Sequence, residues 1–210
     1  MKKQLLCVLI SAAALQVTAA EKWEPATHEC SLEFPDGSWT FQQGKEIDHG
    51  QIILAATNRE RTKDISVVRY LVAPSITVQD PRFVDGIKSG FAKSGGRMLS
   101  DGYTNVNGRV AYWFAGEGFA NGRKISTLRY AVCEKGRLYQ LMAESIGGSS
   151  LNDNELPAIL GSFQIHGEAL PSATVSRGDT MAYRIGQITG FLLVLILAGG
   201  IGVRLFRKRA

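Results

Sequence analysis

The hydrophobic pattern of the chain is clearest near its C-terminal end. Residues 185–203 form an uncharged run, IGQITGFLLVLILAGGIGV, with polar side chains only in its first turns. A helix needs about 20 apolar residues to cross the roughly 30 Å hydrocarbon core of a bilayer, and a buried soluble helix of this length normally shows a polar face. The pattern therefore predicts a transmembrane helix over residues 184–204.

A second apolar run lies at the N-terminus. Two lysines precede the run QLLCVLISAAALQV, and the small residues TAA follow it. A basic start, a short apolar stretch and a small-residue end are typical of a secretory signal peptide. We expect residues 1–20 to be removed on export, so that the mature chain begins near Glu21.

The two runs together predict the membrane topology. Residues 184–204 would stop translocation, and the tail of residues 205–210 would stay in the cytoplasm, because basic residues flank membrane helices on that side. The expectation is a single-pass protein of a bacterial inner membrane, with residues 21–166 in the periplasm and a short linker over 167–183. The residues that set this orientation are Arg204, Arg207, Lys208 and Arg209.

The exported part shows the two-residue alternation and turn signals of a β-sheet. Asn107-Gly108, Asn121-Gly122 and the EKG sequence at residues 134–136 favour tight hairpin turns. The segments between them are rich in β-branched and aromatic residues and predict a four-stranded antiparallel meander. These segments are residues 97–106, 109–119, 123–133 and 137–145. Three more strands are predicted over residues 28–35, 51–58 and 65–73.

Two helices complete the predicted domain. Within residues 76–96, Asp80 can cap a helix, Pro81 suits its first position, and apolar residues recur at four-residue spacing. A last helix, over residues 153–163, carries its apolar side chains on roughly one face. An antiparallel sheet of six or seven strands flanked by helices gives the fold class α+β.

The order of these elements resembles the Mog1/PsbP-like fold, which includes the DcrB-type bacterial domains. The resemblance is carried by SLEFPDGSW, VNGRVAYWFAGEG, GRLYQLMAES and ILGSFQI, and it covers about residues 30–166. It implies a binding module without naming the ligand, and it supplies no catalytic residues.

The overall net charge of +5 is not the charge of the predicted exported domain. Removing the signal peptide and the basic flanks of the span leaves 17 Lys and Arg against 19 Asp and Glu in the exported part. A slightly acidic domain lacks the basic surface that nucleic-acid binding requires, so we expect no nucleic-acid partner.

Two cysteines remain after the signal peptide is removed. An even pair in an oxidising compartment favours a disulfide between Cys30 and Cys133. In the chain-entropy model, a loop of this length would stabilise the fold by about 4–5 kcal/mol. The alternative, two separate buried thiols acting as small hydrophobic side chains, stays open.

Recognisable catalytic and cofactor motifs are absent from the sequence. There is no nucleophile elbow, the glycines at residues 95–96 and 116–118 indicate turns and caps and not a phosphate-binding loop, and the three histidines have no metal-ligand spacing. We therefore expect no enzyme activity, no cofactor and no metal. A hydrolase that uses two carboxylates stays open, because spatial pairing is invisible in a sequence.

Candidate contact residues are few. Trp113 alternates with small residues, Ala111 and Ala115, and this pattern suits either a ligand groove or a ring packed under a helix. Arg69 and Arg129, in the middle of strands, are the other predicted surface residues. Within the span, small residues at four-residue spacing permit close helix packing and a homodimer. These are Gly186, Gly190, Ala198 and Gly202.

The sequence thus predicts a non-catalytic, membrane-tethered binding module, an accessory or assembly factor for another protein of the envelope. A sensor or carrier of a small molecule or lipid is the first alternative, and a hydrolase of envelope polymers is the second.

Overall fold

The computed structural model describes residues 20–47, 50–120, 122–148 and 153–166. The predicted signal peptide up to residue 19, the linker, the span with its small-residue pairs and the basic tail lie outside these residues. Within the described part of the chain, no helix is both long and apolar enough to cross a membrane.

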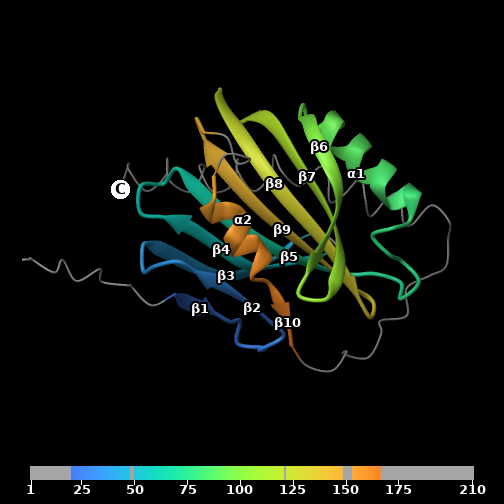
Figure 1. Cartoon of the computed structure of the whole chain (residues 1–210), viewed down its shortest axis with the longest axis horizontal. Coiled ribbons are helices and arrows are strands. Elements are labelled where there is room, and N and C mark those ends of the chain that lie inside the picture. The colour runs from blue at the N-terminus through green and yellow to red at the C-terminus, as the bar shows by residue number, and fades with distance from the viewer. Residues whose placement is uncertain (1–19, 48–49, 121, 149–152, 167–210) are drawn as a thin grey trace, which may run out of the picture.

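The largest element is a seven-stranded sheet, in which all neighbouring strands are antiparallel, in the order β3-β4-β5-β9-β8-β7-β6 (Figure 1). An antiparallel sheet with two helices confirms the predicted α+β class. The strands are β3 (Trp39–Ile47), β4 (Gly50–Asn58), β5 (Lys63–Leu71), β6 (Arg97–Val106), β7 (Arg109–Ala120), β8 (Arg123–Glu134) and β9 (Arg137–Ile146).

The predicted meander is the β6–β9 half of this sheet. Its turns have the backbone that the sequence demands: φ is +47° at Asn107 and +84° at Gly108, and +45° at Lys135 and +82° at Gly136. Positive φ at both central residues matches the right-handed twist of a two-residue hairpin, which keeps consecutive strands in register.

Strand β3 was not predicted, and its composition explains why. The central segment QQGK has no alternation of apolar and polar residues, and most of the strand's described side chains are exposed. An edge strand can be polar because it has a neighbouring strand on one side only, and only one of its faces needs to be buried.

The two faces of the sheet are covered by different elements (Figure 1). Helix α1 (Pro81–Lys93) lies on one face, and helix α2 (Glu155–Gly161) lies on the other, together with a small antiparallel sheet of order β1-β2-β10. The strands of the small sheet are β1 (Glu21–Trp23), β2 (Cys30–Phe34) and β10 (Gln164–Ile165). Each face has its own buried hydrophobic cluster.

Helix α1 begins as predicted. The Asp80 side chain accepts a hydrogen bond from the Arg82 backbone N–H, and Pro81 occupies the first helical position.

Helix α1 packs closely on the sheet at Phe91, because a Cβ added at Gly96 or Gly116 would lie 2.5 Å from the Phe91 ring. Gly116 is therefore a close-packing residue within β7 and not the turn residue that the sequence suggested.

The structure contradicts the predicted disulfide, since Cys30 and Cys133 are free thiols. Cys30 belongs to the cluster under the small sheet, whereas Cys133 packs against the cluster under α1. The large sheet separates the two side chains, so a bond would need one of them to cross it. Burial raises the pKa of each thiol to about 12, with the Glu29 charge adding to the effect at Cys30.

We expect both thiols to be reduced in the protein from its native cells. Unfolding the full chain without reductant in the presence of an alkylating agent should therefore modify Cys30 and Cys133, as peptide mass spectrometry would show. A reduced sample is the control for complete alkylation. A Cys30–Cys133 crosslinked peptide that only reductant removes would contradict the free-thiol structure.

Candidate functional site

Exposed hydrophobic side chains gather on one hairpin of the sheet. Of the five large hydrophobic residues that are exposed in the described part of the chain, only Leu71 lies elsewhere. The other four lie on β6 and β7 and, with the outer edge of β6, define what we call the edge-hairpin surface. They are Leu99, Tyr103, Val110 and Phe119.

The outer edge of β6 has no neighbouring strand among the described residues. Strand β6 pairs with β7 from Arg97 to Val106, and its other side leaves backbone N–H and C=O groups unpaired within that part of the chain. The opposite edge strand, β3, carries the exposed charges of Lys45 and Glu46 and no exposed large hydrophobic residue. Strand β6 also carries exposed charged residues, but of the two edges only β6 has exposed large hydrophobic residues among the described side chains, so it is the more receptive one.

On the α2 side of the hairpin, Trp113 lies half-buried beside the half-buried Tyr130. Gly102 of β6 is directly opposite Trp113, and a Cβ at that glycine would be 3.3 Å from the indole Nε1. The missing side chain lets the ring lie close to the β6 backbone. Trp113 packs on the core cluster that α2 covers, as the second meaning of the sequence pattern predicted, and it borders the edge-hairpin surface.

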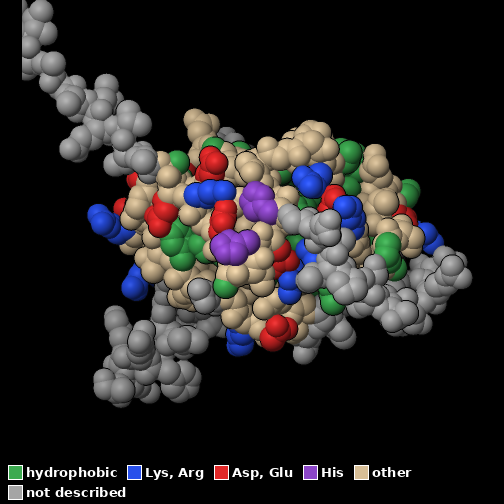
Figure 2. Space-filling view, turned by 90° about the horizontal axis from the view of Figure 1, so that it is seen from below, with side chains coloured by type: hydrophobic (Ala, Val, Ile, Leu, Met, Phe, Trp, Pro, Cys, Tyr) green, Lys and Arg blue, Asp and Glu red, His purple; other side chains and the backbone are tan. Residues whose placement is uncertain are grey.

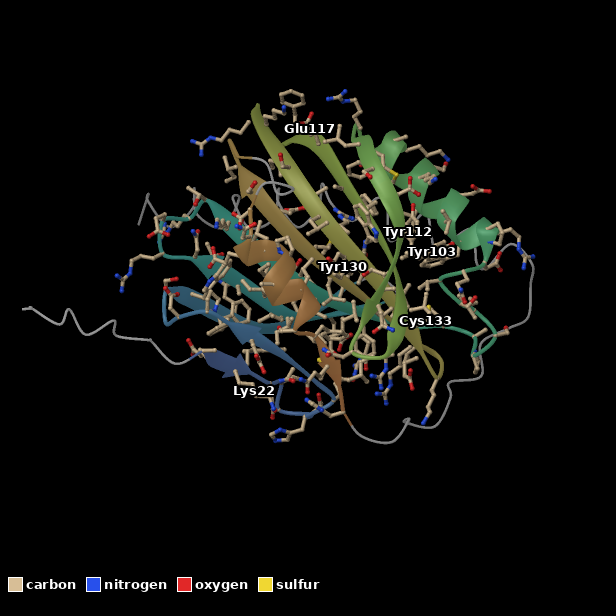
Figure 3. The ribbon with its side chains drawn as sticks, in the orientation of Figure 1. Lys22, Tyr103, Tyr112, Glu117, Tyr130 and Cys133 are labelled. Atoms are coloured by element: carbon tan, nitrogen blue, oxygen red, sulfur yellow. The ribbon has the colours of Figure 1, made fainter. Side chains whose placement is uncertain are left out.

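On the α1 side, Tyr103 is 52% exposed and its ring centroid is 5.7 Å from that of Tyr112 (Figure 3). The Tyr112 hydroxyl donates to the Asp101 carboxylate at 2.8 Å, and the Lys88 ammonium of α1 lies 2.9 Å from the same carboxylate. The Lys88 hydrogen bond, opposed by burial and helped by Tyr112, lowers the pKa of Asp101. These contacts hold the middle of β6 against α1 and leave its outer edge open.

Arg129 does not belong to any surface, and its predicted role is wrong. The side chain is 1% exposed, and its guanidinium lies 5.8 Å from the ring centre of Phe91 and 5.6 Å from that of Phe114. Its Nη2 is 3.7 Å from Oε1 of the buried Glu144. Burial lowers the pKa of Arg129 to about 10 and raises the pKa of Glu144 to about 7. The pair is part of the core under α1.

Arg69 is mostly buried and holds the small sheet to the large one. Its Nη1 lies 2.6 and 2.7 Å from the two carboxylate oxygens of Glu29, and Nη2 donates to Gln51. Glu29 also accepts a hydrogen bond of 3.2 Å from the Tyr139 hydroxyl and has Arg137 at 3.6 Å. Because all these groups bind one another, the network explains the position of Arg69 without a second protein. No pattern in the sequence pointed to Glu29.

The described residues at the end of the molecule near this network form no surface of one charge. In Figure 2, acidic and basic side chains alternate around the two described histidines. His166 bonds through Nε2 to the Ser31 hydroxyl at 2.7 Å, and His28 through Nδ1 to Glu24 at 3.1 Å. Among the described residues, no group of three or more His, Cys, Asp and Glu side chains is placed to hold a metal ion.

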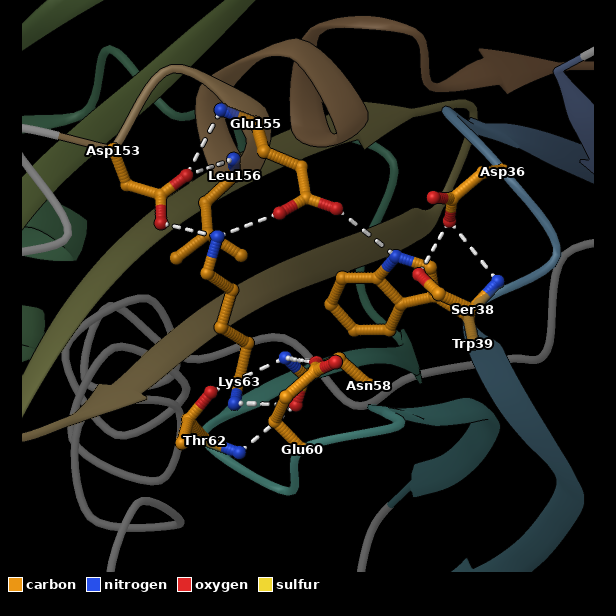
Figure 4. Close-up of polar contacts among 10 residues, drawn as sticks. All are labelled: Asp36, Ser38, Trp39, Asn58, Glu60, Thr62, Lys63, Asp153, Glu155 and Leu156. Carbon is orange, nitrogen blue, oxygen red and sulfur yellow. Dashed lines mark hydrogen bonds and ion pairs between the residues drawn. The ribbon is translucent and has the colours of Figure 1, made fainter. Parts of the chain in front are cut away.

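One pair of carboxylates does come together, at the start of α2 (Figure 4). The Lys63 ammonium lies 2.6 Å from an oxygen of Asp153 and 2.6 Å from an oxygen of Glu155, while the Trp39 indole N–H donates to Glu155 at 3.2 Å. Asp153 also accepts from the backbone N–H groups of Glu155 and Leu156. Burial opposes ionisation of Asp153, but Lys63 and these two N–H groups outweigh it and lower its pKa. An ionised, lysine-bound cap is the opposite of the raised pKa that a glycosidase acid needs.

Comparison with known proteins gives only distant similarities in structure. No family model and no curated protein matches the chain, so the resemblance to the Mog1/PsbP-like fold stays a prediction. A crystal structure from Bacteroides thetaiotaomicron is 10% identical with a TM-score of 0.49; the match covers 70% of this chain and 48% of that one, so the chain spans about half of its length.

Two other solved structures are similar at the same low level. LpqN of Mycobacterium tuberculosis, described as involved in cell envelope biogenesis, is 11% identical with a TM-score of 0.45, over 71% of this chain and 91% of LpqN. The T6SS immunity protein TplEi of Pseudomonas aeruginosa is 15% identical with a TM-score of 0.38, over 61% of this chain and 54% of TplEi. Likeness at this level carries no argument about function.

Proposed function

We propose that this protein is a non-catalytic, membrane-tethered binding module of the bacterial envelope, and that it holds a partner protein at the edge-hairpin surface. The observation that carries the proposal is that Leu99 and Tyr103 are exposed along the edge of β6 that has no partner strand among the described residues, with Val110 and Phe119 exposed on the neighbouring strand β7. Exposed apolar groups that cluster at one place are typical of interaction sites, whereas scattered ones are ordinary.

The physical mode that fits is addition of a strand. An extended segment of the partner would pair with the ten residues of β6 through backbone hydrogen bonds. Successive side chains of that segment would point to the two faces of the sheet, toward Tyr103 and Val110 on the α1 side and toward Trp113 on the α2 side. Backbone pairing would supply affinity and the aromatic contacts would supply selectivity.

The other polar clusters favour a binding role over hydrolysis. Their members hold elements of the fold together: Lys63 binds the start of α2, and Arg69 of the large sheet binds Glu29, directly before β2 of the small sheet. The Lys63 ammonium and two backbone N–H groups lower the pKa of Asp153, whereas a paired-carboxylate hydrolase needs an acid of raised pKa. A small-molecule carrier would need a pocket beside the sheet, and the described contacts on both faces are those of packed hydrophobic clusters.

The proposal is tested by site-specific photo-crosslinking of the full chain in its native membrane. A photoreactive phenylalanine derivative in place of Tyr103 on β6 should give one discrete adduct, because the partner would contact this ring. The matched control is the same derivative in place of Thr40, an exposed residue on the other edge strand, where no adduct is expected. Mass spectrometry of the adduct would identify the partner.

The outcomes separate the possibilities. An adduct of two copies of this chain would replace the envelope partner by a homodimer at the same edge. Equal adduct patterns from both positions, or no adduct at Tyr103 under conditions that crosslink a known membrane complex, would overturn the proposal.

A further inference from the structure

The end of the β7–β8 hairpin carries the most exposed aromatic side chain of the described residues. Phe119 is 71% exposed, and its partner across the hairpin is Lys124. Arg123, also exposed, precedes Lys124 at the start of β8, and Arg97 begins the neighbouring strand β6. We call Arg97, Phe119, Arg123 and Lys124 the basic tip.

Basic groups outnumber acidic ones at this tip. Glu117 bridges Arg97 Nη2 at 2.8 Å and Lys124 Nζ at 2.8 Å, and both cations remain largely exposed, at 74% and 54% of their side chains. The hydrogen bonds from Lys124 and then Arg97 lower the pKa of Glu117, which is therefore ionised. Since one carboxylate faces three cations, the tip keeps a positive charge around the Phe119 ring. Lys93, the last residue of α1, lies only four residues before Arg97.

The shape of the tip favours contact with a lipid surface. Phe119 projects from the end of a hairpin and makes no aromatic contact with the rest of the domain among the described residues. An apolar ring at the end of a projection, surrounded by flexible cations, matches the boundary between acyl chains and anionic headgroups. Lys and Arg side chains near such a surface are attracted by its anionic lipids.

The tip can reach the membrane that the sequence predicts for the anchor. Figure 3 shows Glu117 and Lys22 at opposite ends of the domain, so the tip lies far from the small sheet, where the described chain ends at residue 166. A strand as long as the 12 residues of β7 spans about 40 Å. The predicted linker of residues 167–183 reaches up to roughly 55–60 Å when extended, so it is long enough for either end of the domain to meet the bilayer.

We infer that the basic tip is a second membrane contact: Phe119 inserts among the headgroups of an anionic lipid surface, and Arg97, Arg123 and Lys124 bind the headgroup phosphates. The basic tip lies at one end of the edge-hairpin surface and shares Phe119 with it, but the membrane contact does not require a partner strand along β6. Together with the tether, it would fix the orientation of the domain over the bilayer instead of leaving it free to rotate on the linker.

The test uses the full chain reconstituted into vesicles of phosphatidylcholine, alone or mixed with phosphatidylglycerol, in which part of the lipid is brominated. Phe119→Trp supplies a fluorescent reporter at the tip, and Leu71→Trp supplies a matched reporter at an exposed residue outside the tip. The unsubstituted protein gives the background of the native tryptophans. Bromine quenches only tryptophan that reaches the lipid.

The expected result is strong quenching of F119W in the anionic vesicles, weak quenching in pure phosphatidylcholine, and little quenching of L71W in either. Adding Arg123→Glu and Lys124→Glu to F119W should lower the ratio of inserted to free tip by ~10-fold or more, because two attractive charges become repulsive. Added salt should also reduce the quenching of F119W that keeps Arg123 and Lys124. Equal quenching of F119W and L71W would overturn the inference. So would quenching of F119W that does not change with phosphatidylglycerol, salt or charge reversal.

Discussion

Replacing Arg129 by alanine is expected to lower the free energy of unfolding by about 3–5 kcal/mol above about pH 7, where Glu144 is ionised in the folded protein, the range found when one partner of a buried ion pair is removed. The truncation would leave the Glu144 carboxylate buried beside an empty space, and it would remove the guanidinium that lies over Phe91 and Phe114. Denaturant unfolding of the full chain in mild detergent, followed by near-ultraviolet circular dichroism, would measure the change.

Two further variants separate the charge effect from a loss of packing. Arg129→Met combined with Glu144→Leu removes both charges and keeps most of the volume, so it should recover much of the lost stability. Arg97→Ala removes an exposed arginine that is also paired with a glutamate, and it should cost far less. A loss for R129A no larger than that for R97A would show that the buried pair does not stabilise the fold.

Arg129 also shows where sequence reasoning stops. In RKISTLRYAVC, an arginine between apolar residues indicates which face of the strand it occupies, but not whether that face is covered. Here Phe91 of α1 covers it, and α1 comes more than thirty residues earlier in the chain. Burial of a charged residue depends on such distant contacts, and its partner Glu144 lies on another strand. For the same reason, Glu29 could not be predicted from the sequence as the partner of Arg69.

Local signals were enough for the elements that local physics determines. The turns at Asn107-Gly108 and Lys135-Gly136, and the cap and proline at the start of α1, were predicted because each depends on a few adjacent residues. Strand order is different, since β5 pairs with β9 across more than 65 residues of chain. That pairing closes the sheet in its middle and leaves β6 and β3 as the edges.

Only part of the candidate site could therefore be predicted from the sequence. The alternation around Trp113 identified a ring among small residues, and the structure places it on the β6–β7 hairpin as a half-buried side chain. The edge position of β6, and hence the meaning of Tyr103 and Phe119, follows from strand order and could not be read from spacing. The predicted disulfide was wrong for a related reason, because counting cysteines says nothing about which side of a sheet each one faces.

The buried Glu144 should also make stability depend on pH. Burial raises its pKa from 4.5 to about 7, with Arg129 opposing the change and Asp64 adding to it. Between these two values the folded protein binds the proton more tightly than the unfolded chain, so the free energy of unfolding falls as pH rises through this window. The contribution of this carboxyl group should be complete below about pH 4.5 and lost above about pH 7, with a size on the order of 1–3 kcal/mol.

Unfolding of the wild-type chain and of Glu144→Gln should therefore be compared across this pH range. Other titrating groups, Asp64 included, are present in both proteins, so the difference between the two curves isolates Glu144. The wild-type protein should lose stability relative to E144Q as pH rises from about 4.5 to 7, because the amide carries no proton to release. Parallel curves would mean that the Glu144 carboxyl titrates as it does in the unfolded chain. A difference of the opposite sign would mean that Arg129 outweighs burial and holds the carboxylate ionised, which makes the pair a stabilising salt bridge and not a strained one.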